Sequence, residues 1–265
     1  MQVSAEALGP RSARELLAAE ADEVLLPCID EIDDAIDEAA RVEGPVTVHT
    51  PANRIADPQR VLDRLREAGV DSVLMVSGNP GHGRGSRTLY ELISFFRKHG
   101  VHVSVGAYPE DYFRTTSRAH RSKSAGILVD KQAAGAQRVI TQASFSVQNI
   151  QKWLMTVRSR GVVLPVHVGV MARVPGHTLA AVMRRARAEL FTHPRMQVAS
   201  KENLDMMFRM LWSHVPSPEA LIGEIGALDE MGGDDGFHVF GYGADITHLI
   251  SAGHGAGGSA DAEAT

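Results

Sequence analysis

The sequence predicts an α/β fold, a (β/α)₈ TIM barrel, on three observations. Short β-type runs alternate with helical stretches along the 265 residues. Successive runs are spaced by roughly 30 residues, as in the βαβ units that build a parallel sheet. About eight runs fit into about 250 residues, which is the usual size of such a barrel. A doubly wound open sheet is the alternative, but no early Gly-x-Gly-x-x-Gly turn supports it.

Strands are expected where short apolar runs rich in β-branched residues lie between glycines, prolines and charged residues. The run 72–76 is almost entirely apolar, as is typical of a strand covered on both faces. The expected strands are 2–8, 23–28, 46–49, 72–76, 101–107, 138–141, 162–170 and 236–240.

Helices are expected where apolar residues recur at helical spacing between charged ones. The expected helices are 58–68, 88–99, 118–134, 147–160, 178–190 and 245–250. The acidic stretch 22–43 keeps Ile32, Ile36 and Ala39 at helical spacing, which favours a solvated helix face over a metal cluster. We expect one barrel domain over 1–250 and a flexible tail rich in Gly and Ala over 251–265.

Composition excludes several classes of protein. Hydrophobic residues make up 44% and charged residues 22%, which is typical of a globular domain and not of a disordered one. The net charge of −5 argues against a nucleic-acid partner. No apolar run is long enough to span a membrane, no signal pattern begins the sequence, and Cys28 is the single cysteine. A cytoplasmic location is therefore expected.

Polar residues at the carboxyl ends of barrel strands are the candidates for chemistry. Glu6 lies in a strand-like run closed by Gly9-Pro10. Facing the barrel, its carboxyl would lose water and its pKa would rise, as a general acid requires; the alternative is a solvent-facing carboxylate. Gln142 directly follows a strand, and its amide suits a heterocycle edge or a helix cap.

Other motifs are weaker. The glycine-rich loop 77–85 has amides that suit a phosphate, but a surface loop has the same composition. His49 and His167 lie in apolar strands, where a core histidine is more common than a ligand. Met206, Met207 and Met210 are interpreted as core packing. No histidine spacing predicts a metal site.

These strand-end residues resemble the methylenetetrahydrofolate reductase family, flavin-linked (β/α)₈ enzymes of one-carbon metabolism. The segment 134–142, AGAQRVITQ, resembles the family's AGAxRxITQ strand. Four further segments resemble family motifs in the same order along the chain: 3–11 (VSAEALGPR), 48–50 (VHT), 105–110 (VGAYPE) and 236–240 (GFHVF).

The resemblance implies roles for individual residues. Glu6 would be the acid that protonates the folate and opens its methylene bridge. Gln142, Asn79 and Phe240 would bind the folate substrate. The residues implied for the cofactor site are His49, Thr50, Ser77, Tyr108 and Lys131. The implied cofactors are FAD and NADH or NADPH, and the implied ligand is a tetrahydrofolate derivative.

The chain departs from the family at its flavin contacts. The family's Arg-Gly-Asp is Ser77-Gly78-Asn79 here, its consecutive Arg-Lys is Asp130-Lys131, and a late arginine is replaced by Ala244. Losing these charges changes how a flavin and a folate are recognised. The segment between Glu6 and His49 is shorter than in the family, so the resemblance implies a (β/α)₈ barrel with a shortened N-terminal third. A barrel left open there would expose a strand edge, which a homo- or hetero-oligomer could cover.

Two functions follow from these residues. The first is an oxidoreductase that reduces 5,10-methylenetetrahydrofolate to 5-methyltetrahydrofolate, taking the hydride from a reduced flavin or directly from a nicotinamide. The second is a folate-binding barrel without redox chemistry, either a methyl-group transferase or a partner subunit. A barrel with no link to folate would require the match at 134–142 to be chance.

Overall fold

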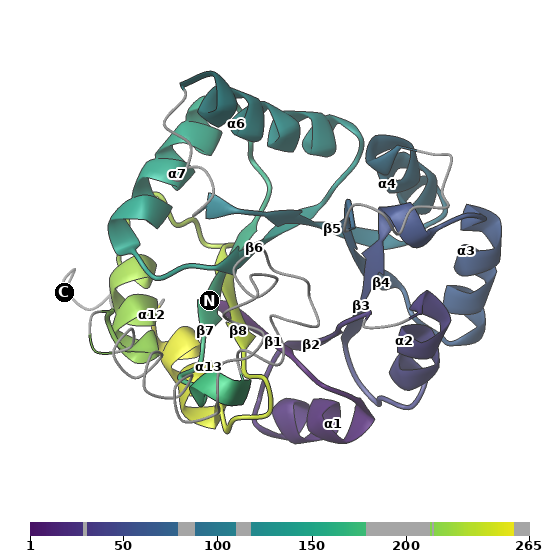
Figure 1. Cartoon of the computed structure of the whole chain (residues 1–265), viewed down its shortest axis with the longest axis horizontal. Coiled ribbons are helices and arrows are strands. Elements are labelled where there is room, and N and C mark those ends of the chain that lie inside the picture. Colours follow the sequence, from purple (N-terminus) through teal and green to yellow (C-terminus); the bar gives the residue numbers. More distant parts are fainter. Residues whose placement is uncertain (29–30, 79–87, 110–117, 179–212, 214, 257–265) are drawn as a thin grey trace.

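Eight parallel strands form a closed barrel in which every strand pairs with its neighbours in chain order, and β8 pairs with β1. The computed structural model describes residues 1–28, 31–78, 88–109, 118–178, 213 and 215–256. The described helices lie around the outside of the strands (Figure 1). The predicted (β/α)₈ fold is confirmed, and the short N-terminal third still closes the barrel. The open strand edge that would have called for an oligomer is therefore absent from the described barrel.

The strands lie close to their predicted positions. They are β1 Gln2–Glu6, β2 Glu23–Leu26, β3 Val46–Pro51, β4 Ser72–Val76, β5 His102–Ala107, β6 Arg138–Ala143, β7 Val166–Met171 and β8 Gly236–Phe240. The largest difference is at β7, which begins at Val166 and not at 162. Val162 and Leu164 are buried in the connection before the strand, so their apolar character reflects burial and not β structure.

The helices begin at identifiable caps. The Asp57 carboxylate accepts the backbone N–H groups of Gln59 and Arg60, and Thr88 and Glu91 form a capping box. The described helices are α1 Pro10–Ala18, α2 Ile32–Ala39, η1 Ala52–Arg54, α3 Pro58–Glu67, α4 Leu89–Lys98, α6 Arg118–Ala133, α7 Val147–Ser159, α12 Pro218–Gly226 and α13 Thr247–Gly255.

The acidic stretch is a helix, as predicted. Ile32, Ile36 and Ala39 of α2 are buried, and its acidic residues Asp33 and Asp37 form ion pairs with Arg60 and Arg64. Helix α13 continues to Gly255, into the segment expected as a tail. The expected helix at 178–190, the methionines at 206, 207 and 210, and residues 257–265 lie outside the described residues.

The core has two separate parts. The larger lies between the strands and the surrounding helices and includes the fully buried Phe96, Trp153 and Phe237. The smaller consists of Leu25, Leu74 and Ile140, from alternate strands β2, β4 and β6. Side chains from alternate strands meet in this way inside a barrel, so this cluster identifies the residues that face the interior. Because side chains alternate along a strand, it also fixes which other residues face inward.

The floor of the barrel, at the amino ends of the strands, is polar. Arg138 Nη2 lies 2.6 Å from Glu23 Oε2, and Arg138 Nε donates to Ser104 Oγ at 2.9 Å. The Thr47 hydroxyl donates to the second oxygen of Glu23. This network fills the space below the apolar layer with paired charges and hydroxyls.

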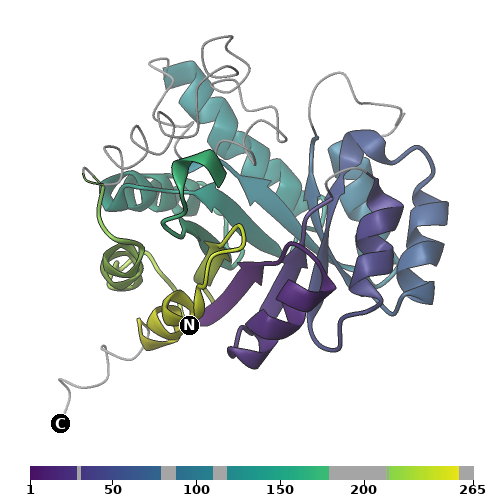
Figure 2. The same cartoon turned by 60° about the horizontal axis from the view of Figure 1, so that its bottom comes forward.

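The two ends of the described chain lie on the same side of the closed barrel, where β1 pairs with β8. Strand β8 pairs with β1 so that Ala5 lies opposite Val239. Below them, Asp22 Oδ2 accepts the Val3 N–H at 2.7 Å and lies 3.0 Å from His254 Nε2 of α13. The N-terminus accordingly lies beside α13 (Figure 2). Of the helices described here, none is both long and apolar enough to cross a membrane.

Candidate functional site

The mouth of the barrel, at the carboxyl ends of the strands, collects the predicted site residues. Alternation from the inner layer directs Glu6 of β1 and His49 of β3 inward, above Leu25 and Leu74. On β6, Gln142 lies two residues beyond Ile140, in the stretch where the pairing with β7 shifts, and it is exposed. Residues distant in the sequence thus share one opening, which is where barrels of this type carry their function.

Glu6 has the character of an acid near neutral pH. It is partly exposed in the mouth, but the surrounding protein removes most of its water. This burial raises the pKa of its carboxyl to about 7 from the ordinary 4.5. About half of the Glu6 side chains therefore hold a proton at neutral pH. The expectation of a barrel-facing carboxyl, and not a solvent-facing one, agrees with this placement.

The histidines of the interior are neutral. Burial and the charge of Arg54 lower the pKa of His49 to about 4, and burial lowers the pKa of His238 to about 3. Below the mouth, Ser4 Oγ lies 3.0 Å from His238 Nδ1 and 3.3 Å from His167 Nδ1. The Ser4 hydroxyl also lies 3.4 Å from the Phe237 carbonyl, and its single proton goes to one of these three partners. His167 is therefore a core histidine bound to Ser4.

Gln142 is exposed at the mouth because β6 is irregular there. The pairing of β6 with β7 shifts between Ile140 and Ala143. The Gly169 N–H donates to Thr141 Oγ1 at 2.8 Å, and the Thr141 hydroxyl donates to the Gln142 carbonyl at 3.0 Å. A Cβ on Gly169 would lie 2.4 Å from the Thr141 carbonyl oxygen, so the strands approach this closely only at a glycine.

Phe240, which is expected to bind the substrate, is buried at the end of β8. It is 7% exposed, with its ring at 4.6 Å from the His238 ring in a T-shaped contact. Its other neighbour is Tyr242, whose ring stacks on it at 6.1 Å. Tyr242 was not among the site residues predicted from the sequence. Its spacing of two residues from Phe240 and four from His238, on one face, is the pattern that could have identified it.

The residues expected at a cofactor site differ in their exposure to solvent. Ser77 and Tyr108 are exposed just after β4 and β5, and Asn79 lies outside the described residues. Thr50 is fully buried on the outer face of β3, with its hydroxyl donating to the Leu74 carbonyl. Lys131 is 6% exposed, and its amine donates to the Gly106 carbonyl at 2.7 Å.

The contacts of these residues bear on whether they could hold a flavin. A flavin dinucleotide needs cations or free amides for its pyrophosphate. Burial lowers the pKa of Lys131 to about 8, and its amine is already bonded within the fold. The described residues expected to hold FAD thus do not form a cradle for it. No three His, Cys, Asp or Glu side chains of the described residues are arranged to hold a metal ion.

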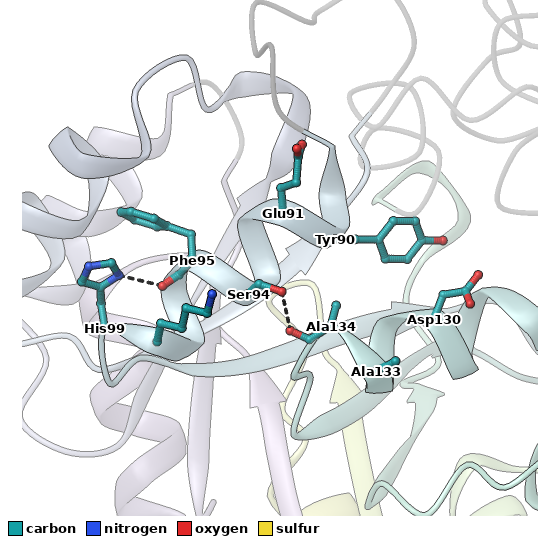
Figure 3. A pocket seen from close by; sticks show the side chains of 9 residues that line it. Tyr90, Glu91, Ser94, Phe95, His99, Asp130, Ala133 and Ala134 are labelled. Carbon is teal, nitrogen blue, oxygen red and sulfur yellow. Dashed lines mark hydrogen bonds between the residues drawn. The ribbon is translucent and has the colours of Figure 1, made fainter.

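A separate groove of about 620 Å³ lies on the outside of the barrel, between α4 and α6. Tyr90, Phe95 and Asp130 line it, and Ser94 donates across it to the Ala134 carbonyl at 2.8 Å (Figure 3). None of the residues expected at the site lines this groove. The mouth of the barrel is therefore the candidate site.

Comparison with known proteins agrees with this geometry. A model of the methylenetetrahydrofolate reductase family matches residues 31–195. The chain belongs to this family. The matched segment includes His49, Lys131 and Gln142, and the predicted membership of the family is confirmed. Glu6, Phe240 and Tyr242 lie outside it and join the site through the closure of the barrel.

Two curated relatives in the methylenetetrahydrofolate reductase family come from yeasts. The chain is 27% identical over 136 residues to methylenetetrahydrofolate reductase 1 of Schizosaccharomyces pombe. It is 28% identical over 137 residues to methylenetetrahydrofolate reductase 2 of Saccharomyces cerevisiae. Each match covers 48% of this chain and 22% of the relative, so the aligned part spans about a fifth of the relatives' length.

Solved structures share the fold of this methylenetetrahydrofolate reductase family member. One is an uncharacterised protein from Clostridium thermocellum that binds two copies of 5-methyl-5,6,7,8-tetrahydrofolic acid. It has a TM-score of 0.58 and 12% identity, and covers 95% of this chain and 93% of its own. An oxaloacetate acetylhydrolase has a TM-score of 0.51 and 10% identity over 95% of this chain and 78% of its own.

Proposed function

We propose that this chain reduces 5,10-methylenetetrahydrofolate to 5-methyltetrahydrofolate by hydride transfer, with Glu6 as the acid. The observation that carries the proposal is the placement of a carboxyl with a pKa of about 7 in the mouth of the barrel. Family membership and the exposed Gln142 amide on the same rim support a folate substrate. The C. thermocellum protein of the same fold, which binds 5-methyltetrahydrofolic acid, supports it further.

The role of Glu6 follows from the chemistry of the methylene bridge. The protonated carboxyl donates its proton to the bridging nitrogen that carries the p-aminobenzoyl ring, and the bond from this nitrogen to the methylene carbon breaks. The electron pair of the other nitrogen forms an iminium with that carbon. The iminium carbon accepts a hydride and becomes the methyl group. A reduced nicotinamide, NADH or NADPH, supplies the hydride and is oxidised, and water returns the proton to Glu6.

Gln142 and the neutral histidines have supporting roles. The amide of Gln142 offers both a donor and an acceptor to the edge of the pterin ring, which orients the methylene carbon. His49 and His238 carry no charge at neutral pH, because their pKa values are about 4 and about 3. A cationic imidazole nearby would favour the carboxylate form of Glu6, so the neutral histidines leave the pKa of this acid raised.

The test begins with an absorbance spectrum of the purified chain. The same sample is then assayed with 5,10-methylenetetrahydrofolate and NADH or NADPH, and oxidation of the nicotinamide is followed at 340 nm. Glu6→Gln should lower turnover at least 100-fold, the scale typical of a general acid, and retain binding of 5-methyltetrahydrofolate. Glu15→Gln is the matched control, because Glu15 is exposed on α1. Equal turnover in wild type and Glu6→Gln would reject the assignment of the acid.

A second function has a specific observation in its favour. Lys131 and Thr50, two residues expected to hold the cofactor, are bonded within the fold, which suits a folate-binding barrel without redox chemistry. Such a protein would act as a methyl-group transferase or as a partner subunit. Binding of 5-methyltetrahydrofolate without oxidation of either nicotinamide would favour this function. A flavin spectrum near 370 and 450 nm, retained after desalting, would favour the flavin-linked form of the reductase.

A further inference from the structure

The turn that follows β8 holds a tyrosine in a backbone conformation that tyrosine rarely adopts. The Ala244 N–H donates to the Gly241 carbonyl at 2.9 Å, which closes a tight turn. Tyr242 has φ 46° and Gly243 has φ 84°, both in the left-handed region. Glycine and asparagine favour these positions, and a tyrosine is strained there. Strain of this kind persists where the surroundings hold it and is concentrated at binding and catalytic sites.

The turn puts the Tyr242 ring at the end of an aromatic row. His238, Phe240 and Tyr242 alternate along the inner face of β8 and its extension. The Tyr242 ring is stacked on that of Phe240, with 6.1 Å between the ring centroids and 23° between the planes. Phe240 is buried and Tyr242 is partly exposed. Of the two rings, that of Tyr242 is therefore the more accessible to a ligand.

The same turn lies alongside the segment that carries Glu6. Strand β8 pairs with β1, with Val239 opposite Ala5. A Cβ on Gly243 would lie 3.9 Å from Leu8 Cδ1, just beyond Glu6 in the chain. The Tyr242 hydroxyl is close enough to Glu6 that the negative charge of the carboxylate, after burial, raises the pKa of the phenol. An acid and an aromatic ring are therefore neighbours at the mouth.

We propose that Tyr242 determines ligand specificity by supplying the aromatic face against which the p-aminobenzoyl ring of the folate lies. This inference rests on the proposed function. The nitrogen that Glu6 protonates is bonded directly to the p-aminobenzoyl ring, so a ring beside Glu6 is in position to contact it. Offset or edge-to-face contact between two aromatic rings adds to the binding that buried area provides. Tyr242 takes the place that the sequence analysis gave to Phe240.

The test measures equilibrium binding of 5-methyltetrahydrofolate to the full chain by calorimetry. Tyr242→Gly should weaken binding about 10-fold, since an aromatic contact of this kind corresponds to that factor. Glycine accepts the left-handed turn, so the variant should keep the circular dichroism spectrum of the wild type. Tyr242→Phe keeps the ring and should bind within about threefold of the wild type.

A second measurement reports the contact directly. In protein with protonated tyrosine rings and all other positions deuterated, the aromatic protons of bound 5-methyltetrahydrofolate should show a nuclear Overhauser effect to one tyrosine. That effect should disappear in Tyr242→Phe. Unchanged affinity in Tyr242→Gly, or an effect that persists in Tyr242→Phe, would overturn the role of Tyr242 alone. A wild-type chain that does not bind 5-methyltetrahydrofolate would reject the proposed function itself.

Discussion

Arg138 and Glu23 face each other across the floor of the barrel, with Arg138 Nη2 2.6 Å from Glu23 Oε2 and both side chains nearly buried. Breaking a buried pair leaves one uncompensated charge, which is far more costly than replacing both partners by apolar groups. Arg138→Met should therefore lower the free energy of unfolding by about 3–5 kcal/mol in urea titrations.

Two further variants make this prediction specific. The double variant Glu23→Leu with Arg138→Met should recover most of the lost stability, since no charge is left unpaired. Arg11→Met breaks the exposed pair of Arg11 with Glu15 and should cost less than about 1 kcal/mol. A double variant as unstable as Arg138→Met would contradict the buried pair as the cause.

Glu6 should make the protein less stable as the pH rises. Its folded pKa of about 7 lies above the ordinary 4.5, so its contribution is fully present below pH 4.5 and is lost as the pH rises through 7. Glu6→Gln does not titrate, and at pH 8 it should be more stable than the wild type by up to about 3 kcal/mol. Urea titrations at pH 5 and pH 8 measure this, with Glu15→Gln as control. If the unfolding free energies of wild type and Glu6→Gln changed equally between pH 5 and pH 8, the pKa of the Glu6 carboxyl would not be raised in the folded protein.

His49 should have the opposite effect at acid pH. Its folded pKa of about 4 lies below the ordinary 6.5, so its contribution is present above pH 6.5 and is lost as the pH falls toward 4. Between pH 6.5 and pH 5 this loss is up to about 2 kcal/mol. His49→Gln should flatten the decline of the unfolding free energy over that interval. The prediction fails if the variant and the wild type lose stability at the same rate.

Gly169 should be essential to the position of Gln142. A methyl group on Gly169 would overlap the Thr141 carbonyl, so Gly169→Ala must push β6 away from β7. We expect a loss of stability of about 1–3 kcal/mol and weaker binding of 5-methyltetrahydrofolate. Gly223→Ala is the matched control, because no atom lies within 4 Å of its added Cβ and alanine is favoured over glycine at this exposed position of helix α12. Equal binding by wild type and Gly169→Ala would remove the link to Gln142.

The fold was predictable because its elements are defined locally. Charges and apolar residues at helical spacing, and caps such as Asp57, act within a few residues of each other. The alternation of side chains could also have shown that Thr50 faces away from the interior once His49 faces it. The predicted start of β7 at Val162 was wrong, because an apolar residue that is buried in a connection gives the same sequence pattern as a residue of a strand.

The site was predictable only in part because it depends on non-local geometry. The resemblance of short motifs led to Glu6 and Gln142, which both lie at the mouth. Nothing in the sequence near Lys131 shows that its amine is bonded to the Gly106 carbonyl of another element. The stacking of Tyr242 on Phe240 arises from a positive φ, which a tyrosine in the sequence does not indicate.

Closure of the barrel through β1 and β8 has a consequence for biosynthesis. The Ser4 hydroxyl meets His238 across a separation of 234 residues, and the segment that carries Glu6 lies between β2 and the last strand. During translation the barrel cannot close until β8 has left the ribosome, so Glu6 lacks until then the part of its surroundings that β8 and the turn after it supply. A nascent chain at that stage would lack the closed mouth in which burial raises the pKa of Glu6, however much of its matched family segment had already folded.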